Sequence, residues 1–188
     1  FCADNGVVAE NVTQSGQEVT SIVAENFCTG DTSMCKMADI AGAKVVPVDM
    51  GMATPVTHSR MRDLRIAAGS KDMLKGPAMT RDEAERGVMS GMKLALELAE
   101  GGVDLFATGE MGIGNTTTSS AVASVLLSEP VVTMTGPGAG LSKEGVLHKI
   151  DVIERSIALN APDPHDPIDV LAKVGGFDIA GMVGLDLG

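Results

Sequence analysis

The strongest constraint on the fold is a predicted strand, a glycine turn and a helix in direct succession. Val103–Ala107 reads as the strand, residues 108–115 form the turn, and the helix runs to about Leu127. A second predicted strand, Val131–Thr135, ends in a second glycine turn, Gly136–Gly140. Strands that alternate with helices in this way predict an α/β fold, here a Rossmann-like open, largely parallel sheet with helices on both faces. Ligands of such sheets bind at the carboxyl ends of the strands.

Helical spacing and capping residues predict the other elements. Thr80 and Glu83 form a capping box, so a helix should begin there and stop at Gly101-Gly102. Residues 51–79 are irregular and long for a passive connection, which fits a binding segment and a disordered insertion equally well. The apolar run 179–185 is compatible with a strand or a helix. The remaining expectations are helices over 17–27, 34–43, 142–160 and 168–173 and a strand over 44–50.

Composition and charge exclude several classes of function. The net charge is −11 and the aromatic content is 2%, so no basic stripe or stacking platform suits nucleic acid. No apolar run approaches the length of a membrane span, and no signal peptide is visible. The three cysteines lack CxxC spacing and the three histidines lie far apart, so we expect reduced thiols, no metal site and a cytoplasmic protein.

The first glycine turn is the best candidate for a ligand site. Glycines 109, 112 and 114 expose backbone amides, and Asn115, Thr116 and Thr117 begin a helix whose N-terminus favours an anion. An ordinary tight turn with helix capping explains the same residues without any ligand. No Gly-Lys-Ser/Thr follows, and the spacing G-x-x-G-x-G differs from a dinucleotide fingerprint, so neither NTP nor NAD is favoured. Glu110 would repel a polyphosphate, but it could hydrogen-bond a ribose hydroxyl.

The second glycine turn could bind the same anion if the two predicted strands are neighbours. Gly136–Gly140 opens the next helix, and Lys149 lies about two turns into it, where it could add a cation. Taken alone, Lys149 fits a solvated surface lysine better than a ligand-binding residue.

Beyond these features, the segment Gly109–Thr117 resembles the signature of the nicotinate-nucleotide:5,6-dimethylbenzimidazole phosphoribosyltransferase family, also called CobT. Further segments resemble that family in the same order, over nearly the whole chain. They are Ala3–Val7, Gln17–Thr20, Val48–Gly51, Lys75–Arg81, Gly136–Leu141 and Val174–Phe177.

The resemblance implies an enzyme of cobalamin lower-ligand synthesis. Family members transfer phosphoribose from nicotinate mononucleotide to 5,6-dimethylbenzimidazole, releasing nicotinate and forming α-ribazole 5′-phosphate with inversion at the anomeric carbon. By this analogy Glu110 contacts the ribose or stabilises its developing positive charge, and Gln17 and Met111 line the pocket for the benzimidazole. The residues expected to hold the nucleotide are Gly112, Ile113, Gly114, Asn115, Thr116, Gly136, Gly138, Ala139, Gly140 and Lys149.

The resemblance also predicts what residues 1–188 lack. The family's general base is a Glu beyond the position of Gly188, and the N-terminal helices that contribute to the dimer are not matched. We therefore expect a nucleotide-binding α/β domain that belongs to a homodimer, needs no cofactor, and transfers slowly by itself. A non-catalytic nucleotide-binding or base-binding homologue and a Rossmann-type oxidoreductase remain as alternatives.

Overall fold

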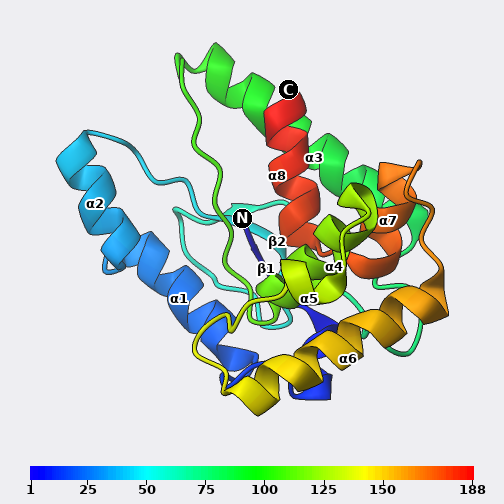
Figure 1. The fold of residues 1–188 in the computed structure, drawn as a ribbon. Coiled ribbons are helices and arrows are strands. Elements are labelled where there is room, and N and C mark those ends of the chain that lie inside the picture. Colours follow the sequence, from blue (N-terminus) through cyan, green and yellow to red (C-terminus); the bar gives the residue numbers. More distant parts are fainter.

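The computed structural model describes all residues from Phe1 to Gly188 as helices arranged around a small parallel sheet (Figure 1). The strands are β1 (Cys2–Ala3), β2 (Val48–Gly51) and β3 (Arg62–Asp63), in the order β1-β2-β3. Cys2 pairs with Asp49, and Val48 pairs with Arg62. This parallel sheet with its helices confirms the predicted α/β class.

The helices account for most of the chain. The apolar run 179–185, left open by its pattern, is part of a helix. The bounds are η1 (Gly6–Glu10), α1 (Glu18–Thr29), α2 (Ser33–Ala41), α3 (Arg81–Glu100), α4 (Asn115–Leu127), α5 (Val131–Met134), α6 (Lys143–Asn160), α7 (Pro167–Val174) and α8 (Phe177–Leu187).

Helices cover both faces of the sheet, as its alternating side chains require. Ala3 and Met50 belong to the largest core cluster, which also contains residues of α3 and α8. The neighbouring Cys2 points the other way and packs with Ala24 of α1. In Figure 1, α8 and α3 lie together on one side of the strands, and α1 with α2 extends along the other.

Glycines set the close approach of α3 and α8. A Cβ on Gly87 would lie 2.8 Å from Cβ of Ala180, and a Cβ on Gly184 would lie 2.9 Å from Cα of Gly91. Any side chain at these positions would push the two helices apart. This packing explains how a core almost free of aromatic residues still fills its volume.

A second core cluster places the two glycine turns near each other. Its buried residues come from η1, the 70–79 segment, α4, α6 and α7, and include Ala121, Val152, Ile153 and Val170. Because α4 and α6 pack within this cluster, the turns that precede them are brought to the same part of the molecule.

Residues 51–79 are mostly irregular, as predicted, but they are an ordered part of the fold. The amide of Ser70 donates to the carbonyl of Asp4 at 2.9 Å, and the amide of Met79 donates to the carbonyl of Ala172 at 2.8 Å. Met73 is fully buried. The interpretation of this segment as a disordered insertion is therefore wrong.

Two strand predictions are wrong. Residues 103–107 form no strand: Leu105 is 87% exposed, and the chain pairs with β1 only beyond this segment, at Met111. A strand needs a partner along its length, and the sequence pattern could not reveal that none is present. Val131–Met134 is the short helix α5, because Pro130 starts a helical turn in which the amide of Thr133 donates to the Pro130 carbonyl at 2.9 Å.

The first residue of β2 also differs from the prediction. The strand begins at Val48, whereas the apolar pattern predicted a start at Lys44.

None of the helices combines the length and apolarity needed to cross a bilayer.

The capping box at the start of α3 is confirmed and gives a first prediction. The amide of Glu83 donates to Oγ1 of Thr80 at 3.2 Å, and the amide of Thr80 donates to Oε2 of Glu83 at 2.7 Å. Replacing Thr80 by Ala should lower the free energy of unfolding by about 1 kcal/mol, because a first-turn amide loses its acceptor. Urea unfolding measures this. The exposed Thr57→Ala is the control, and an equal loss in both variants would contradict the role of the cap.

Candidate functional site

The first glycine turn lies against the carboxyl end of β1. A Cβ on Gly112 would collide with the carbonyl oxygen of Ala3, and Gly114, the residue before α4, has φ +91°. Both positions therefore require glycine. The turn delivers the N-terminus of α4 to the edge of the sheet where ligands of α/β folds bind.

The second glycine turn touches the start of α4, as the sequence predicted. Gly138 has φ +54°, and a Cβ there would lie 3.0 Å from Oγ1 of Thr116 and 3.6 Å from Nζ of Lys149. Nζ of Lys149 donates to Oγ1 of Thr116 at 2.6 Å. These three residues come from the turn, α4 and α6, so they join both glycine turns at one point.

Lys149 is buried, which the sequence alone did not favour. The residue is only 1% exposed, and burial lowers the pKa of its ammonium group. Thr116 provides its only hydrogen bond and no carboxylate forms an ion pair with it. A buried ammonium without a counter-ion is costly, and an anion beside it would offset that cost.

Some backbone amides of the two turns are already used within the protein, and others are free. Ile113 donates its amide to Oγ1 of Thr20 at 3.1 Å, and Thr116 donates its amide to Oδ1 of Asn115 at 2.8 Å. In contrast, no hydrogen bond within the protein uses the amides of Gly138 and Ala139. The amides of Gly112 and Gly114 are likewise unused, so both turns provide free amides, and the first turn adds the hydroxyl of Thr116.

Glu110 and the residues expected around the acceptor base lie near the first glycine turn. Nδ2 of Asn115 donates to Oε2 of Glu110, which holds this half-buried carboxylate beside the helix start. Met111 packs against the cluster formed by Cys2, Ala24 and Met52. Gln17 is the residue before α1 and lies one turn from Thr20, whose hydroxyl accepts a hydrogen bond from the first glycine turn.

Three buried carboxylates lie near these groups, and the sequence motifs did not predict them. Asp4 follows β1, Asp49 lies in β2 and Asp178 lies in the first turn of α8, and all three are buried. Burial raises the pKa of each, and for Asp178 burial and the nearby charge of Glu110 raise it to about 6. The sequence did carry signals for two of them, because Asp4 and Asp49 lie in or directly after an apolar strand and within the family-like segments Ala3–Val7 and Val48–Gly51.

The structure favours neither a cysteine nucleophile at Cys2 nor a cluster of metal ligands. Burial raises the pKa of Cys2 to about 11, so this thiol is protonated at neutral pH and is a poor nucleophile. No group of three or more His, Cys, Asp or Glu side chains is arranged to hold a metal ion.

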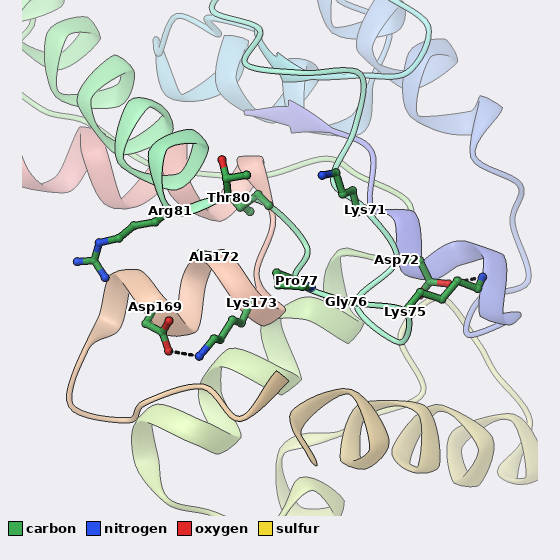
Figure 2. Close-up of a pocket in the computed structure, with 11 residues that line it drawn as sticks. Lys71, Asp72, Lys75, Gly76, Pro77, Thr80, Arg81, Asp169, Ala172 and Lys173 are labelled. Atoms are coloured by element: carbon green, nitrogen blue, oxygen red, sulfur yellow. Dashed lines mark hydrogen bonds and ion pairs between the residues drawn. The ribbon is translucent and has the colours of Figure 1, made fainter. Parts of the chain in front are cut away.

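A cavity that none of the glycine-turn residues lines lies elsewhere in the molecule. It has a volume of about 520 Å³ between the 71–81 segment and α7 (Figure 2). Four cations line it, but three are already paired with carboxylates, which neutralise them. Their pairs are Lys75 with Asp72 and Glu10, Arg81 with Glu85 and Asp166, and Lys173 with Asp169.

Comparison with known proteins identifies close relatives. Residues 1–188 match the family DBI_PRT, described as phosphoribosyltransferase. The nicotinate-nucleotide–dimethylbenzimidazole phosphoribosyltransferase of Clostridium acetobutylicum is 49% identical over 188 residues, and that of Escherichia coli is 43% identical. The alignments cover all of this chain and 53% and 52% of those proteins, so the chain spans about half the length of the curated relatives it matches.

A solved structure agrees with these sequences. The crystal structure of CobT from Thermus thermophilus superposes with a TM-score of 0.93 at 35% identity, covering 99% of this chain and 56% of that one.

The raised pKa of Asp178 gives a prediction for stability against pH. Its carboxyl has a pKa of about 6 in the folded protein against 3.8 ordinarily, so the folded state favours the neutral form. The stabilisation is complete below pH 3.8 and is lost as the pH rises through 6, about 3 kcal/mol in all. Urea unfolding between pH 4 and pH 8 should show this fall, and Asp178→Asn should remove the part that Asp178 causes, leaving the part due to Asp4 and Asp49, whose pKa burial also raises.

The control is the exposed Asp186→Asn on the same helix, which should leave the pH dependence of the parent unchanged. An Asp178→Asn variant that keeps the slope of the parent would show that another group is responsible.

Proposed function

The chain belongs to the nicotinate-nucleotide–dimethylbenzimidazole phosphoribosyltransferase family, and we propose on that premise that it binds nicotinate mononucleotide. We further propose that the whole protein transfers the phosphoribosyl group to 5,6-dimethylbenzimidazole or a related flat base. Residues 1–188 then serve as the nucleotide-binding α/β domain.

One observation carries the proposal: the buried ammonium of Lys149 meets Thr116 and Gly138 where the two glycine turns touch. A monophosphate at this point would accept hydrogen bonds from Nζ of Lys149, from Oγ1 of Thr116 and from the free amides of the second turn. It would also supply the negative charge that the buried ammonium lacks. The place suits one phosphate group, because Glu110 nearby would repel a longer chain of phosphates.

The reaction that follows breaks the N-glycosidic bond of nicotinate mononucleotide. Its electron pair goes to the pyridinium nitrogen, so nicotinate leaves as a neutral pyridine ring and needs little acid catalysis. A benzimidazole nitrogen forms the new bond to the anomeric carbon from the opposite face, and the proton on the other ring nitrogen goes to a base. The ribose carries positive charge in between, and a carboxylate beside it stabilises that charge.

The residues around the turns fit the remaining roles. Glu110, fixed by Asn115, is the carboxylate that would contact the ribose. Met111 and Gln17 would line the slot for the acceptor base, because α1 and the first turn are tied together by Thr20. We assign the proton acceptor to a part of the protein outside residues 1–188, as in the family that the chain resembles.

Assembly and location belong to the same proposal. We infer a homodimer, since family members form one, and a cytoplasmic protein, since all three cysteines are free and buried.

Incubation of the protein with both substrates tests the proposed function. The complete gene product should convert nicotinate mononucleotide and 5,6-dimethylbenzimidazole to α-ribazole 5′-phosphate and nicotinate, followed by liquid chromatography with mass detection. The isolated 188-residue chain should bind the nucleotide but transfer about 10² to 10⁴ times more slowly, because it lacks the general base. Equal rates would contradict the assignment of the base, and no product from the complete protein would contradict the function.

Lys149→Met should weaken the binding of nicotinate mononucleotide at least tenfold, measured by isothermal titration calorimetry. The reason is the loss of a buried charge-assisted hydrogen bond to the phosphate. Removing a buried charge should leave the fold intact, which thermal unfolding checks. Lys143→Met is the matched control, since Lys143 is exposed at the start of the same helix and its replacement should change affinity less than twofold. Equal affinity of the Lys149→Met variant and the parent would exclude this lysine from the site.

A further inference from the structure

Beneath the first glycine turn lies a buried polar pair that the proposed reaction leaves unused. Asn5 follows β1 and Asp178 lies in the first turn of α8, and neither residue is exposed at all. The two side chains meet beside Gly176, where a Cβ would lie 2.5 Å from Oδ1 of Asn5 and would collide with Oδ1 of Asp178. They therefore connect α8 to the end of β1 below the candidate site.

The side chain of Asn5 packs directly against the first glycine turn. A Cβ on Gly112 would lie 3.1 Å from Nδ2 of Asn5, and a Cβ on Gly114 would lie 3.2 Å from its Cβ. Oγ1 of Thr118 donates to Oδ1 of Asn5 at 3.5 Å, which adds a link to α4. A shift of the Asn5 side chain would therefore move the turn, and with it Glu110.

Asp178 is a buried charge that the fold does not fully satisfy. Oδ1 accepts the amide of Ile179 at 3.0 Å, whereas Oδ2 has no hydrogen-bond partner. Burial and then the charge of Glu110 raise the pKa of Asp178 and outweigh the lowering effect of the neighbouring Asn5 side chain, whose Nδ2 forms no hydrogen bond in the structure. An asparagine of the same shape would avoid the cost, and groups kept at a cost to stability are typical of functional sites.

We propose that Asp178 is a positioning residue for the sugar site. Through its contact with Asn5 it fixes the position of the first glycine turn, and therefore the position of Glu110 relative to the ribose. Its carboxylate also places a second negative charge behind Glu110, in a region from which water is excluded. Both effects favour the positive charge that develops on the ribose as nicotinate leaves. The proposal rests on the proposed function, because the sugar is that of nicotinate mononucleotide.

Steady-state kinetics and thermal unfolding of Asp178→Asn in the complete gene product test the proposal. The kcat should fall about 10- to 100-fold, the usual effect of removing a group that orients a reacting residue. The KM for nicotinate mononucleotide should stay within about threefold, because the phosphate contacts at Lys149 are intact. The melting temperature at pH 8 should equal or exceed that of the parent, because an unsatisfied charge has been removed. An unchanged kcat, or a lowered melting temperature, would overturn the proposal.

Asp49→Asn is the matched control, since Asp49 is also buried at this edge of the sheet. Its Oδ1 accepts the amides of Gly51 and Met52, both at 2.9 Å, so its role is to fix its own turn. Asparagine keeps an acceptor oxygen for both amides, so this variant should fold normally and keep kcat within about twofold at 25 °C. A loss of kcat as large as that of Asp178→Asn would show that any buried carboxylate here has the same effect, and would overturn the specific role of Asp178.

A double-mutant cycle tests the route through Asn5. If Asp178 acts through Asn5, Asn5→Ala should lower kcat similarly, and the double variant should be little worse than either single variant. Fully additive losses would overturn the route. Absence of transfer by the parent would refute the proposed function together with this role, whereas an active parent with an unaffected Asp178→Asn variant would refute this role alone.

Discussion

The hydrogen bond between Lys149 and Thr116 is the constraint on which the candidate site depends. It ties α6 to the N-terminus of α4 and brings Gly138 into contact with both. Packing of α4 and α6 in one buried cluster sets their separation, so the position of this bond follows from the core. An ammonium buried at such a junction without a carboxylate prepares the site for an anion from outside the protein.

Local signals in the sequence predicted the parts of the fold that depend on neighbouring residues. Thr80 and Glu83 predicted the start of α3 because a capping box is satisfied within one turn. The glycines before Asn115 predicted the turn into α4, and Ser142 predicted the start of α6. The two glycine turns are neighbours, but not because they follow neighbouring strands, since neither predicted strand forms; the packing of α4 and α6 brings them together.

Features set by distant residues could not be predicted. Residues 103–107 have the composition of a strand, but strand formation depends on a partner, and β1 pairs with the chain only further along, at Met111. The residues around Lys149 in the sequence do not reveal its burial, which comes from the packing of α6 against α4 and the second glycine turn. Asp178 was overlooked for the same reason, because its burial and its contact with Asn5 join segments more than 170 residues apart.

The central claim is that one monophosphate binds where the two glycine turns meet. A crystal structure with nicotinate mononucleotide tests it most directly. We predict phosphate oxygens within hydrogen-bond distance of Nζ of Lys149 and the amides of Gly138 and Ala139, with the ribose toward Glu110. A phosphate bound instead in the cavity between the 71–81 segment and α7, or the nucleotide lying away from both turns, would contradict the account.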